Sequence, residues 1–210
     1  MPFFAICNDP FERNRYTHPY VTWDKAFEDK ELDIISDLCE KENLDYGSVL
    51  GREEMEVMKS VRNSQIKFFH VNAETAWIFN RFNSIIGMIN DQFYGFNLNG
   101  YESFQYTVYK GEEQGKYDWH MDTFLGNNLQ NADRNQTRKL SIVMLLSEPD
   151  KDFTGGELEI NIGKEENAMK TDIFKGRIVA FPSFLIHRVK PVLTGIRKSI
   201  VIWVEGPKFV

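Results

Sequence analysis

The sequence contains few cysteines. Only Cys7 and Cys39 occur among 210 residues, and no CxxC pair is present. Disulfide frameworks and zinc–thiolate sites both need paired or clustered cysteines, so the sequence predicts neither. This sparing use of cysteine is typical of proteins in a reducing compartment, and we expect a cytoplasmic location.

Long apolar runs are also missing. No stretch approaches the roughly 18 consecutive apolar residues of a membrane-spanning helix, so we expect no membrane partner. The opening MPFFAICNDPFER has no basic n-region, and its apolar run is too short for a secretory signal peptide.

Basic residues are not in excess. The 25 Lys and Arg residues against 31 Asp and Glu residues give a net charge of −6. A protein that grips nucleic acid through its phosphates needs the opposite balance, so a nucleic-acid partner is not expected. A local basic pocket for a small anion is compatible with this charge.

Common hydrolase signatures do not occur either. The chain has no HExxH motif, which argues against zinc hydrolysis, and no GxSxG motif around a serine nucleophile. Neither cysteine stands in an activating signature.

The chain length suits a single domain over residues 1–210. Apolar residues recur at helical spacing over 25–44 and 73–95, and the segment SVRNSQIKFFHV between them (60–71) is typical of a strand. We expect residues 1–100 to provide helical support together with strands.

From residue 101 onward, short β-rich runs alternate with Gly, Pro, Asn and Asp. Several short strands at this spacing predict a β-sandwich or barrel, here with the two helices on one face. The polar, Asn-rich stretch 123–138 is long for a plain connection, and we interpret it as a candidate lid that is mobile without substrate.

The motif WHMD places His120 and Asp122 two residues apart. In an extended strand such residues point to the same side, so an imidazole and a carboxylate could share one metal ion. A third ligand from another strand would complete the two-histidine, one-carboxylate face of non-haem Fe(II) oxygenases. The HxD pattern is weak by itself, and a surface pair is the alternative.

A second block, FKGRIVAFPSFLIHRVKPVLTGIRKSIVIW (174–203), carries His187 and Arg197 ten residues apart. Two adjacent antiparallel strands could place both side chains in one pocket. A guanidinium deep in a barrel is costly without an anion, and a dicarboxylate could supply one through a bidentate pair. Strand alternation alone leaves open which face of 197–203 is inside.

Four segments now form a pattern in order and spacing: YKGEEQGKYDWHMD (109–122), TGGEL (154–158), GRIVAFPSFLIHRVKPV (176–192) and GIRKSIVIW (195–203). Together they resemble the catalytic domain of 2-oxoglutarate, Fe(II)-dependent oxygenases, especially the prolyl 4-hydroxylase-like branch. The resemblance covers about half of the chain. It implies an α+β fold whose core is a double-stranded β-helix (jelly-roll, cupin-like), with 101–210 as its catalytic part.

By the family pattern, His120, Asp122 and His187 are the Fe(II) ligands, and Arg197 binds the distal carboxylate of 2-oxoglutarate. Further positions match residues that line the cosubstrate pocket, although such side chains more often serve packing: Tyr109, Tyr117, Ser199 and Trp203. Arg62, in an Arg-x-Ser segment, is a weaker match to a substrate-binding residue. The strand KLSIVMLL (139–146) lacks a cosubstrate-binding tyrosine that some prolyl hydroxylases carry.

The resemblance implies a dioxygenase that uses Fe(II), 2-oxoglutarate and O2, with ascorbate as a candidate reductant, and releases succinate and CO2. The expected partner is a protein or peptide substrate, with proline as the first expected site of hydroxylation. A free amino acid or small metabolite is an alternative substrate. A methylated nucleobase is not favoured as the substrate, because Trp203 stands where the nucleic-acid demethylase branch carries a second Arg. A non-catalytic jelly-roll binding module is the alternative from another class. The oligomeric state is left open.

Overall fold

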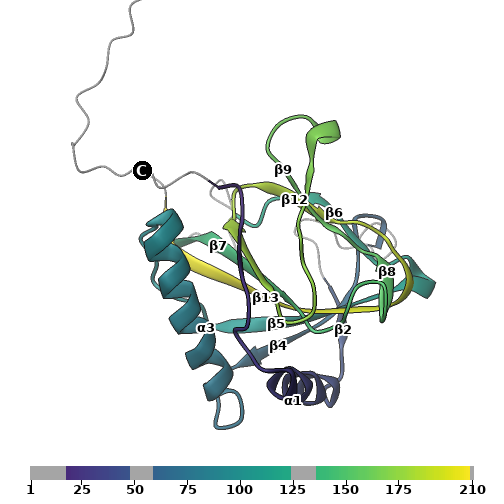
Figure 1. Ribbon diagram of the computed structural model, residues 1–210, viewed down its shortest axis with the longest axis horizontal. Helices are drawn as coiled ribbons and strands as arrows, with labels where there is room; N and C mark the ends of the chain where they lie inside the picture. The colour runs from purple at the N-terminus through teal and green to yellow at the C-terminus, as the bar shows by residue number, and fades with distance from the viewer. Residues whose placement is uncertain (1–17, 48–58, 124–135, 209–210) are drawn as a thin grey trace, which may run out of the picture.

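The computed structural model describes residues 18–47, 59–123 and 136–208. Two antiparallel sheets face each other within these residues (Figure 1). The major sheet has the order β1 (Val21–Trp23), β11 (Ile178–Pro182), β7 (Gln136–Leu145), β13 (Val192–Pro207), β5 (Ser103–Lys110), β4 (Gln65–His70) and β2 (Asp45–Tyr46), with β8 (Phe153–Gly155) beside β13. The minor sheet has the order β10 (Met169–Lys170), β9 (Leu158–Asn161), β12 (Ile186–Val189), β6 (Lys116–His120) and β3 (Arg62–Asn63).

Helices α1 (Asp29–Glu40) and α3 (Ala76–Ile89) cover the outer face of the major sheet, on the side away from β9, β12 and β6 (Figure 1). Their apolar stripes pack with the outward-facing residues of the sheet in one core cluster. The expected helical support on one face is therefore present. Short helical turns complete the described elements: η1 (Asn90–Tyr94), η2 (Gly111–Glu113) and η3 (Glu165–Asn167).

The first helix is shorter than the predicted range 25–44. It begins at Asp29, because the Glu28 side chain accepts from the backbone of Glu31 while the Glu31 side chain accepts from the Glu28 N–H. Asp24, which precedes the predicted helix, pairs instead with Arg177 at 2.6 Å. The second predicted helix is present as α3 followed directly by the π-helical turn η1, which together span 76–94, and Gly95 ends η1 with a left-handed φ of 63°.

The segment 60–71 is not one strand, as the sequence pattern suggested. It breaks at Ser64, so that β3 pairs with β6 in the minor sheet and β4 pairs with β5 in the major sheet. The buried Ser64 hydroxyl accepts a hydrogen bond from Arg62 Nε at 3.0 Å, which fixes the corner. The amino-terminal half thus contributes strands to both sheets.

The long strand β13 lies in the middle of the major sheet. It pairs with β5 on one side and β7 on the other, and its first residues pair with β8. Where β13 pairs with the start of β8 only glycine fits: Gly195 has a φ of +72°, and a Cβ there would lie 2.0 Å from the Asp152 carbonyl oxygen. A second apolar cluster fills the space between the two sheets.

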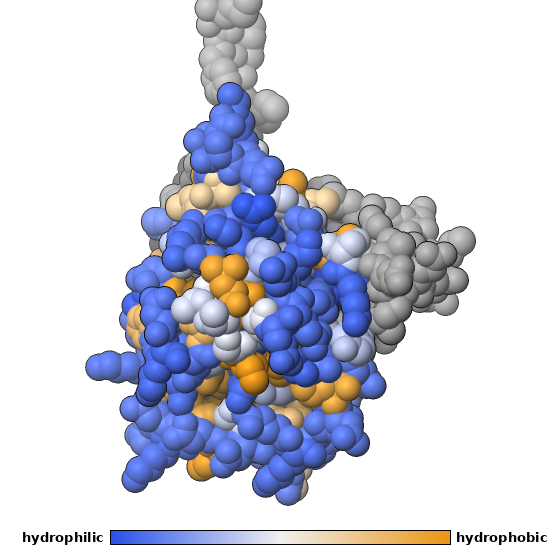
Figure 2. All heavy atoms as spheres, turned by 90° about the vertical axis from the view of Figure 1, so that its right-hand side faces the viewer, coloured by the Kyte–Doolittle hydropathy of each residue, from blue (hydrophilic) through white to orange (hydrophobic). Residues whose placement is uncertain are grey.

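The face shown in Figure 2 is mostly hydrophilic, with apolar residues in small separate groups. None of the helices in the described ranges combines the length and the apolar character that crossing a bilayer would need.

Candidate metal centre

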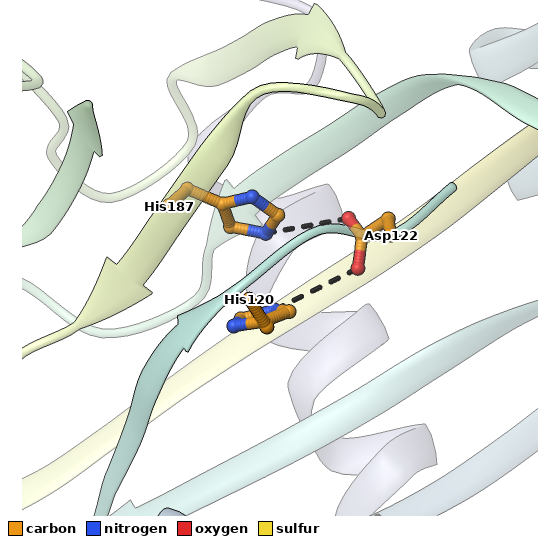
Figure 3. A group of neighbouring side chains, drawn as sticks. All are labelled: His120, Asp122 and His187. Atoms are coloured by element: carbon orange, nitrogen blue, oxygen red, sulfur yellow. Dashed lines mark ion pairs between the residues drawn. The ribbon is translucent and has the colours of Figure 1, made fainter. Parts of the chain in front are cut away.

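Three predicted ligands meet between the sheets (Figure 3). His120 ends β6, and His187 lies directly opposite it on β12 in the strand register. Asp122 points toward both rings, and one ligand atom from each residue lies within 4.8 Å of the others. The chain thus brings together two imidazoles and a carboxylate from segments far apart in sequence.

Asp122 reaches this position by a route that the sequence argument did not foresee. Strand β6 ends at His120, so the two residues do not share a side by strand alternation. Instead, the backbone N–H groups of Asp122 and Thr123 both donate to the Ser183 carbonyl, at 2.9 and 3.1 Å. A turn from another part of the chain therefore aims the carboxylate.

The donor set fits a divalent iron ion. Asp122 Oδ1 lies 3.7 Å from His120 Nε2, and Asp122 Oδ2 lies 3.3 Å from His187 Nε2. Asp122 and His187 are buried and His120 is nearly so. Two nitrogen donors and one carboxylate on one face would leave three positions of an octahedral metal for other ligands.

The ring orientation of both histidines is fixed from behind. His120 Nδ1 lies 2.7 Å from the Asp118 carbonyl oxygen, and His187 Nδ1 lies 2.9 Å from that of Leu185. A ring nitrogen that faces a carbonyl must carry the hydrogen, so Nε2 of each neutral ring keeps its lone pair for a metal.

The proton affinities of the three ligands differ. Burial, together with the charge of His187, lowers the pKa of His120 to about 3. Burial also disfavours charged His187, but the charge and hydrogen bond of Asp122 outweigh it and raise the pKa of His187. Burial opposes ionisation of Asp122, yet the two imidazoles hold the pKa of this carboxyl below its usual range.

We predict that metal affinity depends on pH through one proton. The metal needs neutral His187, whose pKa is raised, so affinity should fall about tenfold per pH unit below that pKa and level off above it. His120 adds nothing there, because its pKa lies near 3. Mn(II) titration calorimetry from about pH 5 to about pH 8 measures this. A slope of two protons, or none, would contradict the assignment.

Arg197 is an uncompensated buried cation. The residue is only 1% exposed. Its Nε donates to the Gly156 carbonyl at 3.0 Å, and its Nη1 donates to Ser199 Oγ at 3.2 Å. Nη2 has no partner, and among the described residues no carboxylate pairs with this guanidinium. Burial accordingly lowers the pKa of Arg197. The free donor fits an anionic ligand such as a carboxylate.

All nine residues predicted from the sequence line one cavity: Arg62, Tyr109, Tyr117, His120, Asp122, His187, Arg197, Ser199 and Trp203. Tyr109 lies opposite Arg197 in the β13–β5 register, with its ring centre 5.4 Å from the guanidinium. The Tyr117 ring stacks on the His120 ring, with the ring centres 3.5 Å apart. The Arg62 guanidinium lies over the same Tyr117 ring, 4.7 Å from its centre. The individual roles of these residues in binding stay predictions.

Several residues beside the cavity were missed from the sequence. Arg138 lies over the Trp203 ring at 4.1 Å, because the β13–β7 pairing shifts by one residue around Lys139 and so turns Arg138 to the inner face. Gln105 accepts from Arg62 Nη2 at 3.4 Å. A one-residue bulge reverses strand alternation, and no local signal in the sequence marks it.

The candidate lid lies mostly outside the described residues, which omit 124–135. Its two ends are anchored: Thr123 Oγ1 donates to the Arg138 carbonyl at 2.7 Å, and residues 136–138 belong to β7. The lid interpretation therefore does not extend to residue 123 or to residues 136–138.

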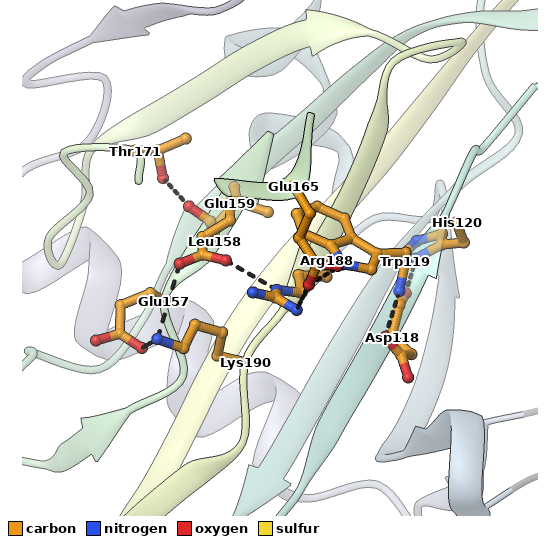
Figure 4. A network of polar contacts seen from close by, with 10 residues as sticks. All are labelled: Asp118, Trp119, His120, Glu157, Leu158, Glu159, Glu165, Thr171, Arg188 and Lys190. Carbon is orange, nitrogen blue, oxygen red and sulfur yellow. Dashed lines mark hydrogen bonds and ion pairs between the residues drawn. The ribbon is translucent and has the colours of Figure 1, made fainter. Parts of the chain in front are cut away.

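A polar network braces the two histidine-bearing strands on their outer face (Figure 4). The Arg188 guanidinium lies over the Trp119 ring at 4.2 Å and pairs with Glu159 at 2.8 Å and Glu165 at 2.9 Å. Trp119 Nε1 donates to the same Glu165 at 3.0 Å. These contacts join β6, β9 and β12 next to the metal ligands.

Comparison with known proteins agrees with this geometry. Residues 104–205, which hold all three candidate ligands and Arg197, match the model of the 2OG-Fe(II) oxygenase superfamily. Residues 104–205 belong to this superfamily. The name states the cofactor and cosubstrate, Fe(II) and 2-oxoglutarate, and the triad and the free Arg197 donor fit both.

Among curated relatives, a PKHD-type hydroxylase of Gloeothece citriformis is 36% identical over 91 residues, which are 43% of this chain and 37% of the relative. Matches to the curated relatives span between 29% and 42% of their length. The chain therefore covers less than half of each.

Solved structures show the fold. A prolyl-4-hydroxylase of Pseudomonas putida has a TM-score of 0.69 at 17% identity, covering 90% of this chain and 93% of that one. A prolyl hydroxylase of Trichoplax adhaerens, in complex with a hypoxia inducible factor peptide fragment, has a TM-score of 0.68 at 18% identity, covering 90% and 84%. These likenesses confirm the predicted double-stranded β-helix core.

Proposed function

We propose that the protein is a 2-oxoglutarate- and Fe(II)-dependent dioxygenase that hydroxylates a peptide side chain, with proline as the first target. One observation carries the proposal: a two-histidine, one-carboxylate triad shares a cavity with a buried guanidinium that has an unpaired donor. A 2-oxo acid with a second carboxylate can chelate a metal at one end and pair with a cation at the other. The triad and the guanidinium together supply these two partners.

In this proposal, His120, Asp122 and His187 hold the iron, while Arg197 and Ser199 bind the distal carboxylate. When bound, iron with 2-oxoglutarate and O2 supplies the oxidising power, releasing succinate and CO2 as a hydroxyl is transferred. The apolar lining residues Leu158 and Val201 exclude water from the same cavity. Tyr109 stays protonated, since burial raises its pKa, and can donate a hydrogen bond.

A peptide substrate is supported by side chains in and beside the cavity and by the relatives. Trp203 Nε1 is buried without a partner, and the guanidinium groups of Arg62 and Arg138 lie on the rings of Tyr117 and Trp203. Such donors and flat walls suit a chain of carbonyl groups. The Trichoplax adhaerens relative is described in complex with a peptide, and the curated relatives are called hydroxylases.

We further propose that residues 1–210 act as one domain, because β3 and β4 of the amino-terminal half complete the two sheets built mainly from residues 101–210. The expected cytoplasmic location stays a prediction.

The test is hydroxylation coupled to cosubstrate turnover. Purified protein with Fe(II), 2-oxoglutarate and proline-containing peptides should add one oxygen atom to a peptide and form one succinate per hydroxyl. The same peptides with proline replaced by alanine, and the His187→Ala variant, are the controls. Oxygen added only to free amino acids would shift the substrate to a small metabolite. A parent protein that binds no metal would favour a non-catalytic jelly-roll module.

A further inference from the structure

The Asp122 carboxylate is held by Ser141, whose hydroxyl in turn contacts that of Ser183, and neither serine was predicted from the sequence as a site residue. Ser141 lies on β7, and Ser183 follows β11 in the turn that also holds the Asp122 backbone. Both serines are fully buried, at 0% exposure. Ser141 Oγ donates to Asp122 Oδ2 at 2.7 Å, and the two serine hydroxyls lie 2.9 Å apart.

The order of donation follows from the number of hydrogens. A serine hydroxyl has one hydrogen, and an ionised carboxylate only accepts. Because the hydrogen of Ser141 goes to Asp122, the hydrogen between the serines must come from Ser183. The chain therefore runs in one direction, from Ser183 to Ser141 to Asp122, and each bond polarises the next.

The same turn also orients a second ligand. The Leu185 carbonyl, two residues after Ser183, accepts from His187 Nδ1 at 2.9 Å, and the Ser183 N–H donates to the Lys139 carbonyl at 3.0 Å. The turn is therefore anchored to β7 at Lys139, two residues before Ser141. Movement of this turn would disturb Asp122 and His187 together.

We propose that Ser183 and Ser141 form a hydroxyl relay that fixes the rotation of the Asp122 carboxylate and so sets the metal affinity of the site; this rests on the metal centre of the proposed function. Ser141 occupies Oδ2, which favours coordination through a single carboxylate oxygen and keeps metal positions open for other ligands. Both serines are positioning residues, because they act through Asp122.

The test measures Mn(II) affinity by titration calorimetry for the parent protein, Ser141→Ala, Ser183→Ala and the double variant. Loss of the Ser141 donor should weaken binding about 10- to 100-fold, as for other partners of metal ligands. Ser183→Ala should weaken it by less. The double variant should match Ser141→Ala, because the Ser183 hydroxyl acts on Asp122 only through Ser141, and the backbone contacts of Ser183 persist in the alanine variant.

Ser147→Ala is the matched control. Ser147 is also a buried serine on the major sheet side, but its hydroxyl accepts from the Lys198 N–H, away from the cavity. It should keep the parent's affinity. The electron paramagnetic resonance spectrum of Mn(II) at saturation should change in Ser141→Ala and not in Ser147→Ala. A general effect of removing a buried serine hydroxyl would change both spectra.

The outcomes separate the relay from the function on which it rests. A parent that binds no Mn(II) overturns the metal centre itself. A parent that binds while Ser141→Ala binds equally well overturns the relay alone, as does full additivity of the two serine effects. If Ser141→Ala loses its fold, Ser183→Ala decides: weaker binding supports the relay, and unchanged binding overturns it.

Discussion

Replacing His187 by alanine is expected to abolish tight metal binding and, with it, hydroxylation. The substitution removes one of three donors, and a metal site draws its free energy from all of them. We expect a loss of affinity on the order of 100- to 1000-fold.

The measurement is Mn(II) titration calorimetry on the variant and on a histidine control. His70→Ala suits this purpose, because His70 is exposed on β4 and its ring faces the Glu102 carbonyl rather than the cavity. The control should bind metal like the parent. Unchanged affinity in His187→Ala would remove this residue from the site.

Replacing Arg197 by alanine should weaken 2-oxoglutarate binding by about 2–5 kcal/mol while metal affinity stays close to that of the parent. The guanidinium is buried, has a free Nη2 donor and lacks a carboxylate partner among the described residues, so an anionic ligand gains a strong pair there. Arg197→Lys keeps the charge but loses the planar fork, and it should fall between the two.

Affinity for 2-oxoglutarate is measured by calorimetry on the Mn(II)-loaded protein. Arg81→Ala is the control, because Arg81 pairs with Glu31 on the helical side, away from the cavity. If Arg197→Ala and the parent bind the diacid equally, another cation serves the carboxylate. Joint loss of metal and diacid would point to damage of the fold.

The local motifs were predictable because their chemistry is carried by residue type and order. His120 and His187 could be named from the sequence, and the structure places them opposite each other in one strand pair. That pairing itself joins distant segments, and nothing in either segment states its register. The family resemblance therefore supplied what periodicity left open, including the inward face of Arg197.

The parts that were missed depend on single-residue irregularities. The break at Ser64 sends Arg62 to the minor sheet, and the shift at Lys139 turns Arg138 inward. In the sequence, Ser141 looks like an ordinary strand residue. Its role depends on contact with Ser183, which follows a different strand. Such contacts arise from tertiary packing, which overrides local preference.

The pairing of β6 with β12 has a consequence for how the protein folds. This pairing closes a loop of more than sixty residues. The chain loses conformational entropy when the loop closes, and other contacts of the fold must offset that loss before the two imidazoles can share an ion. Unfolded chains thus present no chelating group of this kind, so added Mn(II) selects the native molecule. The midpoint of thermal unfolding should rise with metal concentration by mass action, making the ion a reporter of completed assembly.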